Sequence, residues 1–242
     1  MNRIVGLGAV ILFLSVEPVL SQVNDAGMWL STSVSAELTK TLDAEGAVEG
    51  RFNDNFGELA TSFADISLAL KIMRNVQVGV NYRTGTRRNI DNTYGMRQRV
   101  AVDLGLGRYE LRKFDFRFRL RYQFNNAGFG AGEDDVEFSR TFRAKMSVSR
   151  KLMKKTDLRF GGELFFRGFA GTWAFSDLRT GLELRRRINK RQDLSLGYLF
   201  QTELGAANPE RDFVILLGYS WALKGRNYKE KLNHPTTTSE GQ

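Results

Sequence analysis

The chain has 242 residues, and 36 Lys and Arg against 27 Asp and Glu give it a formal net charge of +9. It has no Cys and one His, which excludes disulfides, thiolate metal sites and clusters of imidazole ligands. Mean hydropathy is −0.34, and only the N-terminal stretch is continuously apolar, which excludes a polytopic helical membrane protein. The basic excess raises nucleic acid or an anionic surface as a partner, and the position of the basic residues must decide that question.

Residues 1–21 have the layout of a cleaved secretory signal peptide. Arg3 supplies the positive charge, an apolar stretch follows over residues 4–16, and small residues precede a cut site before Gln22. The apolar stretch is too short to span a bilayer comfortably. We therefore expect an exported protein.

A period of two residues dominates the rest of the chain. In residues 113–125 (KFDFRFRLRYQFN), one parity is entirely apolar or aromatic and the other is charged or polar. Successive side chains of a strand point to opposite faces, so this segment predicts a strand with one apolar and one charged face. The same alternation predicts eleven strand segments in all, at 28–38, 45–53, 64–72, 76–83, 99–106, 113–125, 138–149, 158–167, 177–185, 194–203 and 213–223.

Short connections alternate with longer ones rich in Gly, Asn and Asp, a pattern typical of a meander of antiparallel hairpins. The predicted fold is an all-β, antiparallel up-and-down barrel over residues 22–223, followed by a polar C-terminal tail at 224–242. Bacterial single-chain transmembrane barrels close with an even number of strands, so the odd count gives a prediction of ten to twelve. The longer connections are expected at 53–62, 85–94, 125–137, 168–176 and 204–212.

The alternation fits two kinds of barrel. In a soluble barrel the apolar face fills the core, whereas in a transmembrane barrel it faces lipid and the charged face lines the lumen. Strands of about 9–13 residues can cross a bilayer at a tilt, which favours the transmembrane kind. Aromatic residues near the predicted strand ends favour it too, because they resemble interfacial girdles. These residues are Trp29, Phe52, Tyr82, Tyr109, Tyr122, Phe124, Tyr198, Tyr219 and Trp221.

Five short motifs follow one another along the chain: Trp29 at the first strand, Glu49-Gly50-Arg51-Phe52-Asn53, Gly79-Val80-Asn81-Tyr82-Arg83, Arg117-Phe118-Arg119-Leu120-Arg121-Tyr122 and Glu163-Leu164-Phe165-Phe166. Together they resemble an uncharacterised outer-membrane barrel family, the domain of unknown function 2490. The resemblance extends over roughly residues 27 to 223 and depends on the order and spacing of its motifs. It implies a fold and a location but no activity, so it transfers no site residues.

The sequence offers few residues that could carry out catalysis. A general base must reach the proton that it removes, and the one histidine, His234, lies in the tail beyond the last strand. We therefore expect no enzyme activity, and no catalytic residues, cofactor or metal site.

The candidate site is a lumen-facing charge network that either fills the interior as ion pairs or conducts anions. It consists of Glu49, Arg51, Asp65, Arg83, Arg99, Asp103, Arg117, Arg119, Arg121, Glu163, Arg179 and Glu183.

These observations predict an integral, porin-like β-barrel in the outer membrane of a Gram-negative bacterium. Its expected role is structural, or it lets small solutes pass. Two alternatives stay open, namely a narrow anion-preferring channel with an Arg-lined lumen and a secreted soluble barrel that binds an apolar ligand. The expected partners are outer-membrane lipid and, during biogenesis, the barrel assembly machinery. Nucleic acid is not expected, because basic turns on an exported barrel meet lipid headgroups instead.

Overall fold

The computed structural model describes residues 24–89, 91–111, 113–127, 139–169 and 172–223. The predicted signal peptide, the polar tail and His234 lie outside these residues. None of the described segments forms a helix long and apolar enough to cross a membrane. The described residues form eleven strands: β1 (Asn24–Glu37), β2 (Leu42–Asn53), β3 (Glu58–Met73), β4 (Val76–Arg88), β5 (Tyr94–Leu111), β6 (Phe114–Ala127), β7 (Ser139–Met153), β8 (Thr156–Phe169), β9 (Thr172–Arg187), β10 (Gln192–Glu203) and β11 (Arg211–Ala222).

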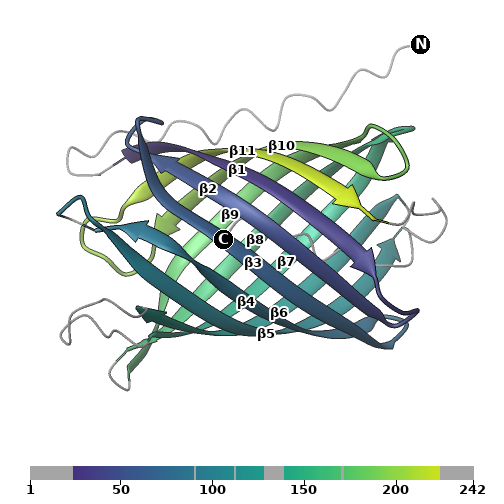
Figure 1. Ribbon diagram of the computed structural model, residues 1–242, viewed down its shortest axis with the longest axis horizontal. Helices are drawn as coiled ribbons and strands as arrows, with labels where there is room; N and C mark the ends of the chain where they lie inside the picture. The colour runs from purple at the N-terminus through teal and green to yellow at the C-terminus, as the bar shows by residue number, and fades with distance from the viewer. Residues whose placement is uncertain (1–23, 90, 112, 128–138, 170–171, 224–242) are drawn as a thin grey trace, which may run out of the picture.

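The strands close into one barrel in which consecutive strands are neighbours and β1 meets β11 (Figure 1). The ten consecutive pairs are antiparallel, whereas β1 and β11 run parallel, from Asn24 opposite Arg211 to Ser35 opposite Ala222. An odd number of strands requires this pair, because strand direction alternates along a meander. The predicted barrel is confirmed and the count of eleven lies within the predicted range, but the closing pair is parallel and the number is not even.

The observed strands extend further than the alternation predicted. The clearest difference concerns residues 168–176, where the sequence predicted a long connection. This prediction was wrong, because β8 continues to Phe169 and β9 begins at Thr172. Aromatic side chains hold this hairpin together, with the rings of Phe166 and Trp173 stacked at 5.4 Å and those of Phe166 and Phe175 at 5.1 Å. Such cross-strand aromatic contacts stabilise pairing where a Gly-rich sequence is typical of a loop.

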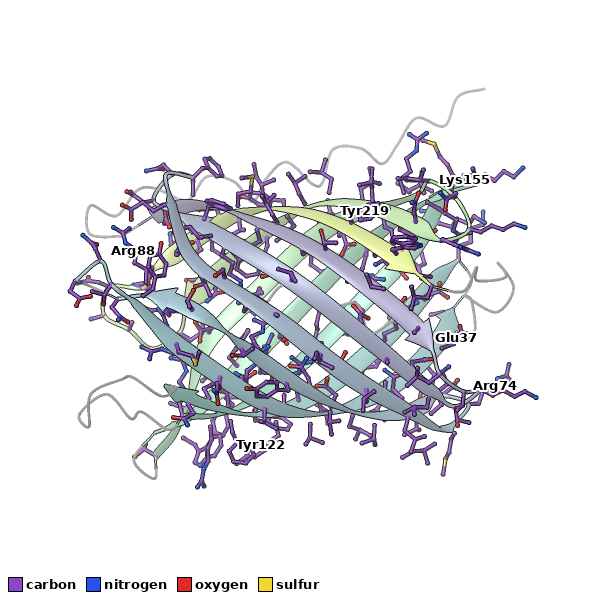
Figure 2. All side chains as sticks on the ribbon, in the orientation of Figure 1. Glu37, Arg74, Arg88, Tyr122, Lys155 and Tyr219 are labelled. Atoms are coloured by element: carbon purple, nitrogen blue, oxygen red, sulfur yellow. The ribbon has the colours of Figure 1, made fainter. Side chains whose placement is uncertain are left out.

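The two ends of the barrel differ. Figure 2 places Glu37, Arg74 and Lys155 together at one end, which we call the short-turn end, and Arg88 at the other, which we call the long-loop end. In the β4–β5 loop beyond Arg88, the hydroxyl and amide of Thr93 donate hydrogen bonds to Asp91 at 2.6 and 3.0 Å. These hydrogen bonds hold the pKa of the Asp91 carboxyl below its usual value.

The outer face of the wall is apolar on every strand. Side chains of one parity are exposed to the outside, and several are more than half exposed, such as Ile66 at 65% and Val48 at 62%. Figure 2 shows Tyr122 pointing away from the barrel on this face. An exposed apolar residue occurs on each of the eleven strands, for example Leu30, Val48, Ile66, Val80, Val102, Phe118, Met146, Phe160, Leu182, Leu196 and Ile215.

Gly85 marks a close approach between β3 and β4. It lies opposite Phe63, and a Cβ atom at Gly85 would overlap the carbonyl oxygen of Ser62 and the Cβ of Phe63. We expect Gly85→Ala to lower the free energy of unfolding by about 1–3 kcal/mol, because the backbone must shift to admit the methyl group. Urea titration of the refolded barrel measures this loss. Gly162→Ala is the matched control, because a Cβ at Gly162 meets nothing within 4 Å, and an equal loss in both variants would contradict the steric explanation.

Candidate functional site

The structure brings the predicted charge network together inside the barrel. All twelve residues lie on the parity opposite to the exposed apolar side chains, and each is buried or half-buried. The buried members are Glu49, Asp65, Arg83, Arg99, Asp103, Arg121, Glu163 and Arg179, and the half-buried members are Arg51, Arg117, Arg119 and Glu183.

Cross-strand register creates the two best-formed ion pairs. Asp65 lies directly opposite Arg83, and Asp103 directly opposite Arg121. Arg83 donates to both carboxylate oxygens of Asp65 at 2.8 and 2.5 Å, and Arg121 does the same to Asp103 at 2.6 and 2.7 Å. Two parallel hydrogen bonds from a planar guanidinium to a carboxylate fix the geometry as well as the charge. Both pairs therefore lock the register of their hairpins.

Glu163 joins three strands in the middle of the lumen. It lies on β8 and is in ion-pair contact with Arg119 of β6 at 3.2 Å and with Arg143 of β7 at 2.7 Å. Arg143 also donates from Nε to Glu163 at 3.0 Å, and it is the most deeply buried large side chain described, at 1% exposure. A charge this deeply buried requires a partner, and Glu163 supplies it.

Three aromatic residues lie inside the barrel, where the sequence analysis did not place them. The sequence predicted that Trp29 lies in an interfacial girdle. This prediction was wrong, because the Trp29 side chain lies inside the barrel and is only 7% exposed. Phe63 and Phe165 are also buried. The sequence does contain a signal for the inward position of all three, because each alternates in step with the polar side chains of its strand. Trp29 has the same parity as Ser31, Phe63 the same as Asp65, and Phe165 the same as Glu163.

Arginines stack on these rings. The Cζ of Arg83 lies 3.3 Å from the ring centroid of Phe63, that of Arg51 lies 3.8 Å from Trp29, and that of Arg143 lies 4.3 Å from Phe165. Guanidinium stacking on an aromatic face is favourable and leaves the in-plane N–H groups available to other acceptors. We call this set the arginine–aromatic layer; it consists of Trp29, Arg51, Phe63, Arg83, Arg143, Phe165 and Arg179.

The layer crosses the lumen. Arg179 of β9 lies 5.1 Å from the ring of Trp29 on β1, although β10 and β11 separate these strands in the wall. Trp29 also packs against Leu199 and Val214, with Leu216 beside them. This contact explains why residues 213–223 are apolar on both parities, since one face of β11 packs on Trp29 and the other lies outside.

A cavity of about 1130 Å³ lies on the long-loop side of the layer. Its wall includes Asn89 and Asn92 of the β4–β5 loop, and its floor includes Trp29 and Arg179. On the short-turn side, a pocket of about 90 Å³ is also lined by Trp29 and Arg179. The layer therefore separates a wide vestibule from a small inner pocket.

The described part of the chain contains no group of three or more His, Cys, Asp or Glu that could hold a metal ion. Its fold and interior define a closed β-barrel with a charged, ion-paired lumen that is divided by a transverse layer. A family model described as protein of unknown function (DUF2490) matches residues 26–214, and the chain belongs to this family. Comparison with the curated proteins gives no match.

Proposed function

We propose that the protein is an integral outer-membrane β-barrel without catalytic activity. The observation that carries this proposal is the apolar outer face, which is continuous over all eleven strands while the charges are inside. A water-soluble protein rarely exposes an apolar surface of this extent, whereas a barrel in lipid requires one. The same observation weighs against the alternative of a secreted soluble barrel that binds an apolar ligand.

The residues at the edges of the apolar face support the proposal that this face is a belt in contact with the membrane. On β7 the outward positions run from Arg140 through Phe142 and Val148 to Arg150, so charges bracket an apolar stretch. Exposed aromatic side chains also occur near strand ends, for example Tyr109 and Trp221. Charged and aromatic residues at these levels suit the headgroup region on either side of a hydrocarbon core. Outer-membrane lipid is therefore the proposed partner, with the barrel assembly machinery during biogenesis.

Membrane fractionation tests the location. We expect the protein in the outer-membrane fraction, resistant to extraction by salt and released by detergent. In unboiled gel samples it should migrate differently from boiled samples, because a folded barrel resists the detergent until heated. A protein that stays in solution without detergent would contradict the proposal.

The structure of the lumen argues against free passage of solutes through the barrel. A narrow anion-preferring channel is the second candidate, and the arginines of the lumen favour it. The arginine–aromatic layer lies across its path, however, and Arg143 within the layer is almost fully buried. We therefore expect planar-bilayer recordings of the purified barrel to lack unit conductance steps in chloride. Regular steps with anion selectivity would support the channel instead.

A further inference from the structure

We infer that the vestibule above the arginine–aromatic layer is a binding site for a small organic polyanion that carries phosphate or carboxylate groups. This inference deepens the proposed function, since it names the ligand class of the barrel that we propose for the outer membrane. It depends on the charge, the hydrogen-bonding state and the size of the vestibule.

Positive charge predominates on the vestibule wall. Nine arginines and five carboxylates of the described chain line it, which leaves an excess of four positive charges. A concave site lined by one sign of charge concentrates ligands of the opposite sign. The arginines are Arg51, Arg83, Arg87, Arg88, Arg97, Arg99, Arg143, Arg167 and Arg179, and the carboxylates are Asp25, Asp177, Glu203, Glu210 and Asp212.

The floor is more basic than the rim. Arg51, Arg83, Arg143 and Arg179 of the layer line the vestibule, but Glu49 and Glu163, which pair with Arg51 and Arg143, line the small pocket on the other side. The guanidinium groups therefore stand between these carboxylates and the vestibule. An anion on the floor meets arginine first.

Arg99 supplies unused donors at this floor. Its side chain is buried at 9% exposure, it lines the vestibule, and its Nε and Nη2 donate no hydrogen bond within the described residues. Arg99 is in ion-pair range of Asp65 at 3.8 Å, but Asp65 already accepts two hydrogen bonds from Arg83. Nη2 of Arg51 also donates none. Buried polar groups are normally satisfied, so these donors indicate an acceptor that a ligand would bring.

Two carboxylates of the wall accept hydrogen bonds from loops near the rim. Asp25, at the start of β1, accepts hydrogen bonds from the amides of Asp54 and Asn55 at 3.2 Å each. Glu203, at the end of β10, accepts one from the amide of Glu210. Trp29 on the floor lies four residues further along β1 than Asp25, about 13 Å along the tilted strand. These two acidic groups therefore stabilise loops at the mouth. Asp177 lies deeper, opposite Phe165 of the layer, and accepts hydrogen bonds from Ser176 and Gln201.

The size and the charge count together indicate the ligand class. A volume of about 1130 Å³ slightly exceeds the usual range of small-molecule pockets, so the vestibule has room for an organic molecule and not only for a bare ion. Several converging guanidiniums match a ligand with more than one negative charge, because each planar fork suits one oxyanion group.

Calorimetric titration of the purified barrel in nonionic detergent, at constant ionic strength, tests the inference with pyrophosphate and citrate as probes. We expect saturable binding of at least one probe at millimolar concentration or below, and binding by one alone identifies phosphate or carboxylate as the preferred group. Arg99→Gln should weaken the affinity about tenfold or more, since it removes charged hydrogen bonds to the anion.

Arg187→Gln is the matched control, because Arg187 faces the lumen at the short-turn end and does not line the vestibule. It should leave the affinity unchanged. If heat-shifted gel mobility shows that Arg99→Gln has not folded, Arg51→Gln replaces it with the same expectation. Absence of saturable binding of both probes to the folded wild-type barrel would overturn the inference, as would equal weakening by Arg187→Gln. Because binding is measured in micelles, this result is separate from the fractionation that tests the membrane location.

Discussion

Phe118→Arg should lower the free energy of unfolding from a lipid bilayer by about 2–4 kcal/mol, because it places a charge near the middle of the apolar belt. Phe118 is exposed on the outer face of β6 and lies opposite Met146. Met146 is central in the apolar stretch of β7 that Arg140 and Arg150 bracket. Reversible urea titration in lipid vesicles measures the loss.

Phe114→Arg is the matched control for this prediction. The substitution is the same and Phe114 is also exposed on β6, but it lies opposite Arg150 at the short-turn edge of the belt. A charge near the interface costs about 0–1 kcal/mol, so this variant should remain close to the wild type. Losses that are small and equal for both variants would mean that the outer face of β6 does not contact the hydrocarbon core.

Glu163→Gln should destabilise the barrel from the inside by about 3–5 kcal/mol, because it leaves the buried Arg143 without its carboxylate. Glu163 is in contact with Arg119 and Arg143, and Gln preserves its shape while removing the charge. The measurement is again urea unfolding, together with the temperature at which heat-shifted mobility is lost.

Glu58→Gln provides the comparison for this variant, since the Glu58 side chain is 41% exposed and its ion pair with Arg88 lies at the long-loop end. An exposed ion pair contributes about 0–1 kcal/mol, so Glu58→Gln should have little effect. A similar result for Glu163→Gln would show that water reaches the lumen centre and screens its charges. Such a result would also weaken the view of the layer as a closed partition.

The sequence predicted which side of the wall each charged residue faces, but not which residues pair. Asp65 and Arg83 share the polar parity of their strands, and parity is a local property that a few neighbouring residues establish. Their pairing depends on register, which the irregularity at Lys71/Met73 shifts in the β3–β4 pair. The irregularity at Leu106/Tyr109 shifts the register of the β5–β6 pair in the same way, where Asp103 lies opposite Arg121. A bulge changes register without changing the alternation on either side.

The interior aromatic residues illustrate the same limit. Trp29 shares a parity with serines and could have been predicted to face inward on that ground, but its position near a strand end favoured a girdle. Its contact with Arg179 depends on barrel closure, because β1 and β9 meet across the lumen and not through neighbouring strands. No local pattern in either strand encodes that contact.

The sequence by itself therefore determined the strands, their number to within one, and the two faces of the wall, because strand formation and side-chain parity are local. Only the tertiary structure decided the parallel closure of β1 on β11, the layer that divides the lumen and the basic vestibule above it. These features join residues far apart in the chain, and the curvature of a closed barrel brings them within contact distance.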